Sequence, residues 1–168
     1  SLDNRQADLL QSIALQSPYS FLSDAQRSLL FDDCKLVKFE SGQLILRYDQ
    51  LPSRLYLIIS GRIRLLMQSH QTREPLTLDL RGSGQLVGWA SVLRGGPCEW
   101  VLASEDTTAL SISAEKFVTI LLDSPKFLAS FSALTNCQEA YLVTSRASKL
   151  STKLDPSFLS SLIQYSKN

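Results

Sequence analysis

The stretch with the clearest chemical potential runs from Leu86 to Ala103 and reads LVGWASVLRGGPCEWVLA. Gly88 opens it, a short apolar segment follows, and a Gly95-Gly96-Pro97 corner leads into an apolar strand. A chain with this order can wrap backbone N–H groups around a small anion. The residues after the proline are Cys98 and Glu99, and neither side chain can pair with a phosphate. The stretch therefore predicts a ligand-binding scaffold whose ligand has changed or been lost.

The side chains most used in catalysis and metal binding are scarce. The chain has one histidine, His70, in a polar stretch that is typical of a hairpin tip. Its three cysteines, Cys34, Cys98 and Cys137, are far apart and without CxxC spacing. That pattern favours a reduced compartment over a disulfide framework or a zinc site. With so few suitable residues, we expect neither catalysis nor a bound metal.

Length and composition describe a single globular domain. At 168 residues and 44% hydrophobic content, the chain is long and apolar enough to bury a core. Its net charge of +1, with no long run of either sign, shows no footprint of nucleic-acid binding. No apolar run approaches the roughly 20 residues that span a bilayer, and the polar start does not resemble a signal peptide. Because the chain begins at Ser1 and ends in a polar tail, we expect a cytoplasmic segment of something longer.

Hydrophobic spacing divides the chain into a helical start, a strand-rich middle and a helical end. A first helix is expected over 8–15, and Ser23 with Gln26 forms the capping box of a second. From Cys34 to Ser113 the period is two, with frequent turn signals, as in an all-β sandwich or barrel. The strands are expected near 36–39, 44–46, 55–59, 63–67, 76–80, 86–88, 101–103 and 109–112.

The last third of the chain returns to helical spacing. Ser113 is the expected N-cap of a short helix, Pro125 begins a longer one that reaches about Ala147, and Asp155-Pro156 starts a final short helix. The predicted plan has four parts. A helical segment (1–33) is followed by a strand region (34–113) that contains the glycine turn at 84–103. A helical region (114–150) and a linker helix to a following domain (151–168) complete the chain.

Three fragments together resemble the cyclic nucleotide-binding domain family. Residues 41–47 (SGQLILR) resemble its turn-strand G-x-x-I/L-x-x, and residues 55–65 (LYLIISGRIRL) resemble its LY-x-I-x-x-G-x-V-x-L. Residues 84–88 (GQLVG) resemble the start of its phosphate-binding cassette. The resemblance covers about residues 21–150 and implies an eight-stranded antiparallel β-roll, jelly-roll-like, with N-terminal helices and two C-terminal helices. It also implies a noncatalytic regulatory or sensor domain.

The cassette departs from that of members that bind cAMP. There, a glutamate accepts the ribose 2′-OH and an arginine holds the cyclic phosphate; Trp89 and Cys98 stand at those positions here. Loss of one partner of a buried charge pair costs about 2–5 kcal/mol, or roughly 30-fold to several thousand-fold in affinity. The departures argue against ordinary cAMP or cGMP binding and leave a cyclic nucleotide open as a weakly held cofactor. The candidate ligand-binding residues of this degenerate cassette are Gly88, Trp89, Ala90, Ser91, Arg94, Gly95, Gly96, Pro97, Cys98, Glu99 and Trp100.

Several cassette residues have two interpretations each. Trp89 and Trp100, the only tryptophans, either stack on a different planar ligand or fill the old pocket as core. Cys98 is either a modifiable thiol or a small inert residue whose pKa is raised by Glu99. Arg94 either replaces the missing arginine or lies in solvent.

The parent protein also has two interpretations. Residues 88–94 and 97–100 resemble divergent cassettes at the N-terminus of bacterial ABC exporters of the type I secretion class. This implies the cytoplasmic part of an inner-membrane protein that binds no nucleic acid through this segment. The alternative is the sensor half of a catabolite activator-type transcription regulator without its DNA-binding part. The helix expected over 126–147 has two interpretations as well: a homodimer seam of Leu134, Cys137 (or Gln138) and Tyr141, as the resemblance implies, or packing of the same apolar side back on the roll.

Overall fold

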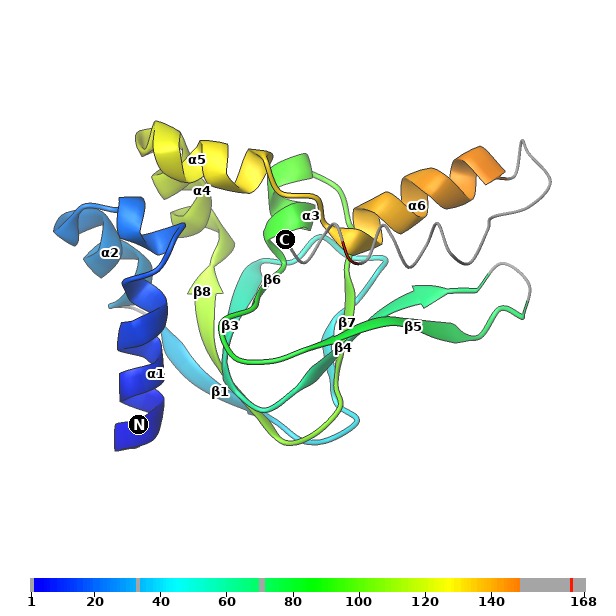
Figure 1. Cartoon of the computed structure of the whole chain (residues 1–168), viewed down its shortest axis with the longest axis horizontal. Helices are drawn as coiled ribbons and strands as arrows, with labels where there is room; N and C mark the ends of the chain where they lie inside the picture. Colours follow the sequence, from blue (N-terminus) through cyan, green and yellow to red (C-terminus); the bar gives the residue numbers. More distant parts are fainter. Residues whose placement is uncertain (1, 33, 70–71, 149–163, 165–168) are drawn as a thin grey trace.

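The centre of the molecule is a β-roll of two four-stranded antiparallel sheets (Figure 1). The computed structural model describes residues 2–32, 34–69, 72–148 and 164. One sheet has the strand order β1-β8-β3-β6 and the other has the order β2-β7-β4-β5. The predicted fold class is confirmed. The strands are β1 Lys35–Phe39, β2 Leu44–Leu46, β3 Arg54–Ser60, β4 Ile63–Gln68, β5 Pro75–Arg81, β6 Leu86–Val87, β7 Trp100–Ala103 and β8 Thr107–Ser113.

Capping boxes begin both N-terminal α-helices. The second box joins Ser23 to Gln26, as predicted. The first joins Asp3 to Gln6, so the first helix begins well before the expected residue 8. The prediction missed this start because the capping signal lies in a polar segment ahead of the first leucines. The elements are α1 Asn4–Ala14, the 3-10 turn η1 Tyr19–Phe21 and α2 Asp24–Phe31.

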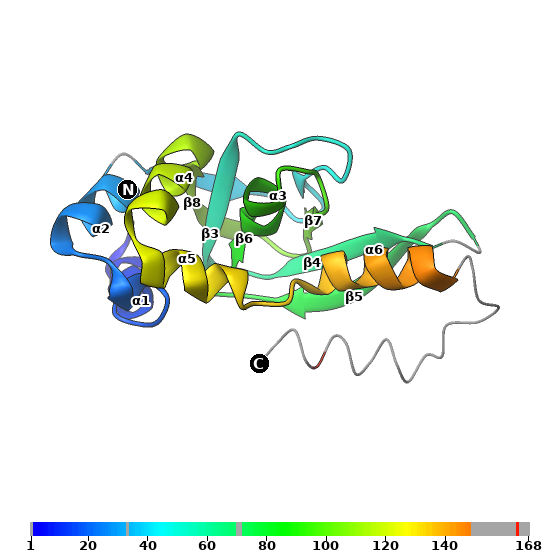
Figure 2. The same ribbon diagram turned by 90° about the horizontal axis from the view of Figure 1, so that it is seen from above.

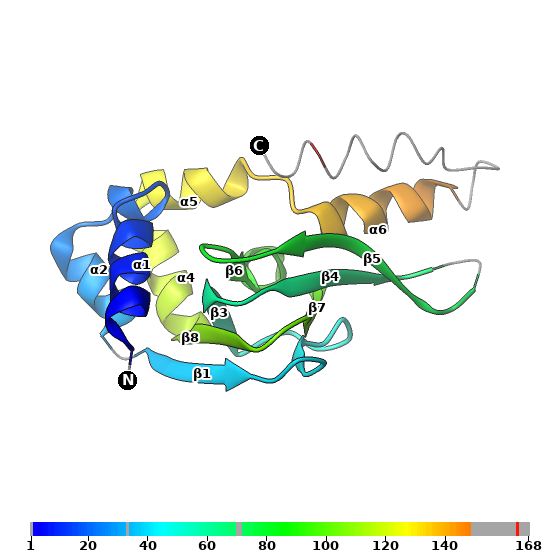
Figure 3. The ribbon, with the colours of Figure 1, turned by 60° about the horizontal axis from the view of Figure 1, so that its bottom comes forward.

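Three helices follow the roll, and they separate onto two sides of it. Ser113 and Ser124 cap the first two, and Pro125 occupies the first turn of the second. In Figures 2 and 3 the first two lie beside the N-terminal helices, whereas the third runs along β4 and β5. The helices are α4 Ala114–Asp123, α5 Pro125–Ser132 and α6 Cys137–Ser148.

The predicted continuous helix from Pro125 to about Ala147 is wrong. The chain leaves the helical path after α5 and starts again at α6. Asn136 explains the restart, because its side-chain oxygen accepts hydrogen bonds from the backbone N–H groups of Gln138 (3.0 Å) and Glu139 (3.1 Å). An asparagine in this position satisfies the free N–H groups of a new helix.

Alternation along β3 builds two cores on opposite faces of the first sheet. Leu55, Leu57 and Ile59 pack against the helices, while Tyr56 and Ile58 contribute to the interior of the roll. The helix-side core contains three phenylalanine rings in mutual contact, and the roll core is aliphatic apart from two rings. These rings are Phe117, Phe127 and Phe131 on the helix side and Phe39 and Tyr56 in the roll.

Some predictions cannot be compared with the structure. His70 and the helix expected from Asp155 lie outside the described residues, except for Gln164. Within the described residues, no helix is both long enough and apolar enough to cross a bilayer. The same part of the chain holds no cluster of three or more potential metal ligands.

Candidate functional site

The predicted glycine turn is a strand–helix–strand unit. It comprises β6, the short helix α3 (Trp89–Arg94) and β7. Gly88 precedes α3 with a φ of 100°, and Gly95 follows it with a φ of 69°. These left-handed conformations favour glycine. A Cβ on Gly88 would also lie 3.5 Å from the carbonyl oxygen of Arg54, so the turn is packed closely against β3.

Glu99 occupies the centre of this turn. Its side chain is only 2% exposed. Oε2 accepts a hydrogen bond from the backbone N–H of Gly88 at 2.8 Å. Oε1 accepts one from the backbone N–H of Ser91 at 2.8 Å and one from its hydroxyl at 2.9 Å. The carboxylate thus binds the donors that the turn would otherwise offer to an anion.

Opposing effects act on the pKa of the Glu99 carboxylate. Burial raises the pKa of Glu99 above its ordinary value, while the hydrogen bonds from Ser91 and Gly88 act in the opposite direction. The negative charge of Glu139 adds to the rise. No arginine or lysine forms a salt bridge with Glu99 among the described residues. Backbone and hydroxyl donors therefore provide its stabilisation.

Cys98 lies beside Glu99 and shares its serine. Its backbone N–H donates to Ser91 Oγ at 3.2 Å, and its Sγ lies 3.5 Å from the same oxygen. Burial raises the pKa of the thiol to about 12 despite the Ser91 hydrogen bond, and the Glu99 charge contributes to the rise. Because the thiolate is the reactive form of cysteine, the geometry favours the inert interpretation.

The two tryptophans have different surroundings. Trp89 is 5% exposed and belongs to the helix-side core, where its ring centroid lies 5.4 Å from that of Phe131. Trp100 is half-buried and lies 5.0 Å from the ring of Tyr48. Trp100, Tyr48, Cys98 and Pro97 all line a hollow of about 260 Å³. Trp89 is therefore a core residue that also borders hollows of about 400 and 160 Å³, and Trp100 borders the hollow of about 260 Å³. A ligand stacked on either ring stays a prediction.

Arg94 forms an ion pair that was not predicted from the sequence. Its Nε lies 3.1 Å from Oε1 of Glu139 on α6, and both side chains are partly exposed. The arginine is therefore an ion-pair partner of α6. It is nevertheless exposed, and its role as a replacement for the cassette arginine stays a prediction.

Gln138 is a structural residue that the sequence analysis did not identify as such. It is fully buried, and its Nε2 donates to the carbonyl oxygens of Leu66 at 3.1 Å and Trp100 at 2.8 Å. Its Oε1 has no hydrogen-bond partner among the described residues. The amide thus joins α6 to β4 and β7. The sequence did contain a signal for the start of this helix, since Asn136 is followed three residues later by Glu139, a spacing typical of a helix N-terminus. It contained no signal for the hydrogen bonds of Gln138.

Most residues of the expected dimer seam are buried within this chain, whereas a dimer seam would be exposed in a single chain. Cys137, Gln138 and Tyr141 are all buried against the roll, and only Leu134 is substantially exposed, at 40%. Three of the four seam residues are therefore used within this chain. The homodimer itself stays a prediction.

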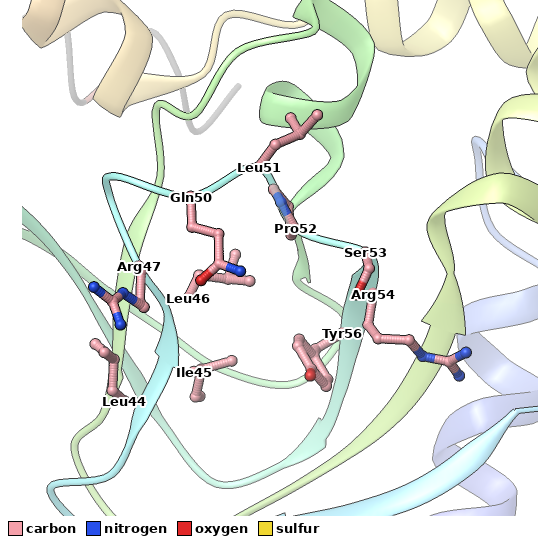
Figure 4. Close-up of a pocket in the computed structure, with 10 residues that line it drawn as sticks. All are labelled: Leu44, Ile45, Leu46, Arg47, Gln50, Leu51, Pro52, Ser53, Arg54 and Tyr56. Atoms are coloured by element: carbon pink, nitrogen blue, oxygen red, sulfur yellow. The ribbon is translucent and has the colours of Figure 1, made fainter.

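A second hollow, of about 280 Å³, lies between β2 and the start of β3 and was not predicted. The segment from Leu44 to Tyr56 supplies its lining (Figure 4). Figure 4 shows the Arg54 guanidinium directed away from this hollow, and it hydrogen-bonds to Ser111 instead. Arg47 is paired with Asp49 at 3.0 Å. Neither cation is left to bind an anion there, and none of the cassette residues lines the hollow.

Comparisons with known proteins agree with this architecture. Residues 36–124 match the model of the cyclic nucleotide-binding domain family. A three-substitution mutant of the regulatory subunit of a cAMP-independent protein kinase A from Trypanosoma brucei, bound to cAMP in its A site, has a similar structure. Its TM-score is 0.67 at 21% identity, covering 83% of this chain and 51% of that one. This chain therefore spans about half the length of that subunit.

Two bacterial regulators are similar as well. The sensor domain of the transcriptional regulator DNR from Pseudomonas aeruginosa has a TM-score of 0.62 at 18% identity, with 73% of this chain and 87% of that one covered. The catabolite activator protein of Thermus thermophilus has a TM-score of 0.55 at 24% identity, with 82% and 59% covered. Comparison with curated proteins gave no match. The family match extends over more than half of the sequence and agrees with the β-roll, so the chain belongs to the cyclic nucleotide-binding domain family.

Proposed function

We propose that this chain is a regulatory domain that works without cAMP or cGMP in its cassette, because the Glu99 carboxylate takes the place of the cyclic phosphate. The observation that carries the proposal is the set of three hydrogen bonds from Gly88 and Ser91 to Glu99. A phosphate entering the turn would have to displace this buried carboxylate and would meet a like charge. Hydrogen bonds to charged groups contribute about 1.5–3 kcal/mol each, so displacement is costly.

The surrounding side chains support the same proposal. Trp89, which stands where the ribose-binding glutamate would be, is packed with Phe131 in the core. Cys98 supplies no positive charge in place of the cassette arginine, and Arg94 is engaged with Glu139. The similar Trypanosoma brucei subunit is a cAMP-independent one, yet a three-substitution mutant of it holds cAMP. By analogy, this cassette lies a few substitutions from binding the nucleotide.

The test is thermal unfolding with cAMP, cGMP and cyclic dinucleotides at millimolar concentration. A site filled at 100 times its Kd stabilises by about 2.7 kcal/mol, or roughly 5–10 °C for a domain of this size. We expect no such shift for the natural protein. The triple variant Trp89→Glu, Cys98→Arg, Glu99→Ala is expected to gain a shift with cAMP.

Matched controls make the result interpretable. Glu99→Gln alone keeps the size of the side chain and should not bind cAMP, because the arginine is still absent. Circular dichroism of each variant checks that the roll has folded. A shift of several degrees with cAMP in the natural protein would contradict the proposal.

The parent protein is a separate part of the proposal. We place the domain in the cytoplasm, attached to a larger bacterial protein, and the resemblance of residues 88–100 favours an exporter. The similar structures reported above belong to kinase regulation and transcription, so the exporter assignment rests on sequence alone. The full-length reading frame tests it. Membrane spans with a downstream GxxxxGK[ST] motif would support an exporter, whereas a helix-turn-helix would favour the transcription regulator.

A further inference from the structure

We propose that a groove between α1 and α2 binds the exposed face of α6 from a second copy of this chain. This surface, here called the α1–α2 groove, is a hollow of about 490 Å³. None of the cassette residues lines it, so the proposal does not rest on the proposed state of the cassette. The residues that define it for this argument are Leu10, Ala14, Asp24, Ser28, Phe31 and Asp32.

The lining of the groove suits a third helix. Along each of the two helices, residues three and four apart line the same hollow, so it follows both helix axes. Leu10 and Phe31 are half-buried against the helix-side core, and Ala14 and Ser28 are small enough to let another helix approach closely. An amphipathic helix laid into an apolar groove is a common form of recognition between proteins. The two rows are Ala7, Leu10 and Ala14 on α1 and Asp24, Ser28 and Phe31 on α2.

The charge of the groove favours a basic partner. Asp24 and Asp32 line it and are exposed. Arg27 pairs with Asp24 at 3.5 Å, and Asp32 forms no salt bridge within the described residues. Residues 2–32 as a whole contain four carboxylates and two cations, a net charge of −2. A helix that docks here should therefore bring a positive side chain to Asp32.

The exposed face of α6 has the complementary character. Val143 is 68% exposed. Arg146, three residues later and thus on the same side of the helix, is exposed and forms no salt bridge within the described residues. Both lie away from the buried side chains of Gln138 and Tyr141, which pack on the roll. Residues 146–168 contain four cations and one carboxylate. In the docked state Val143 enters the apolar part of the groove and Arg146 pairs with Asp32.

The two surfaces cannot meet within one chain. Figures 2 and 3 place α1 and α2 at one end of the molecule and α6 at the other. Gln138 and the Arg94–Glu139 ion pair hold α6 on the roll, so α6 stays at its own end. The contact therefore joins two copies head to tail. Such an interface differs from a pairing of α6 with α6, because it joins two different surfaces.

Sedimentation equilibrium of the natural protein from about 5 to 500 µM tests the association. We expect the average mass to rise above that of one chain with a Kd on the order of 0.1 mM, since the interface is small. Dilute protein is then monomeric. Because the paired charges are exposed, added salt at about 0.5 M should weaken the association. A mass that stays at one chain over the whole range would overturn the inference.

Charge reversal identifies the two surfaces. Asp32→Lys and Arg146→Glu should each weaken association by about tenfold or more, because each places like charges together. An equimolar mixture of the two variants should associate again, since each supplies the surface that the other has lost. The matched controls are Glu105→Lys and Lys126→Glu, at exposed positions outside the groove and α6, and they should associate as the natural protein does.

A filled groove provides a second test that does not depend on charge. Ser28→Trp, at an exposed position, should abolish association without unfolding the domain, as checked by circular dichroism. Weakening by Arg146→Glu but not by Asp32→Lys would indicate pairing between α6 helices and would overturn the inference. Failure of the mixed variants to associate, or undiminished association of Ser28→Trp, would do so as well.

Discussion

Among single side chains, Glu99 has the largest expected effect on ligand binding and on the pH dependence of stability. It is a carboxylate within the protein, held by backbone and hydroxyl donors and without a positive partner among the described residues. Burial without an opposite charge is unfavourable for the ionised form. The turn between β6 and β7 therefore holds a buried carboxylate whose ionised form is opposed by desolvation and supported by hydrogen bonds alone among the described residues.

The pH dependence of stability should carry the signature of Glu99. Its folded pKa is raised above the unfolded value, so the folded state binds the proton more tightly. This contribution to stability is fully present below about pH 4.5, the ordinary value, and is lost as pH rises through the raised pKa. We expect the free energy of unfolding of the natural protein, relative to Glu99→Gln, to fall as pH rises from 4.5.

Urea denaturation of both proteins at a series of pH values measures this difference. Because Glu99→Gln shares every other titrating group, their contributions cancel. If the difference in free energy of unfolding between the two proteins stays constant or grows as pH rises, then burial does not raise the pKa of Glu99.

Some boundaries of the helices and strands could be predicted from the sequence and others could not. The strands and the caps at Ser23 and Ser113 were predictable because their signals are local. The interruption before α6 was not, since apolar spacing continues across it while Asn136 starts a new helix. Trp89 and Trp100 could not be told apart, because the sheet face that each meets depends on contacts made by distant segments.

The candidate site shows the same limit. The glycines at 88 and 95 were evident from the sequence, and the family resemblance placed Cys98 where members that bind cAMP have an arginine. That Glu99 would bind the donors of Gly88 and Ser91 was not, because only the folded turn brings these residues together. The hollow between β2 and β3 depends likewise on side-chain directions that a linear pattern does not encode.

Gln138 should determine the stability of α6 on the roll. Gln138→Ala leaves the carbonyl oxygens of Leu66 and Trp100 without their donor, so we expect a loss of about 1–3 kcal/mol. Hydrogen exchange should quicken in α6 and stay unchanged in α4, which packs elsewhere. The control is Val143→Ala on the same helix, where the side chain is 68% exposed. Equal acceleration in both helices, or none, would contradict this role.

At the scale of the whole molecule, the described residues form a roll with helices on its two sides. The N-terminal helices, α4 and α5 share one core with the first sheet. α6 instead packs against β4, together with Met67, Leu78 and Tyr141. The two sides meet through the roll, through the Arg94–Glu139 ion pair and through Leu142, which packs against the helix-side core. Because that core is the larger of the two, cooperative unfolding should depend chiefly on it.

Phe117 tests that core. It is fully buried and contacts the rings of Phe127 at 5.8 Å and Phe131 at 5.3 Å. Phe117→Ala should therefore lower the free energy of unfolding by about 3–5 kcal/mol in urea denaturation. Phe21→Ala, at a ring that is 45% exposed, is the matched control and should cost much less. Similar losses for the two variants would mean that this cluster does not dominate stability.

The restart of the chain at Asn136 gives α6 the mechanics of a lever. The helix has 12 residues, so its far end lies roughly 18 Å from the pivot at about 1.5 Å per residue. A rotation of about 10° at Asn136 would carry that end through roughly 3 Å by this geometry. The Gln138 and Glu139 contacts lie close to the pivot, whereas Tyr141 and Ser145 are buried farther along the helix. A rotation would have to move both of these side chains, and its effect would be greatest at Ser148, where the described helix ends. A segment attached beyond it would receive a displacement several times larger than the one that caused it.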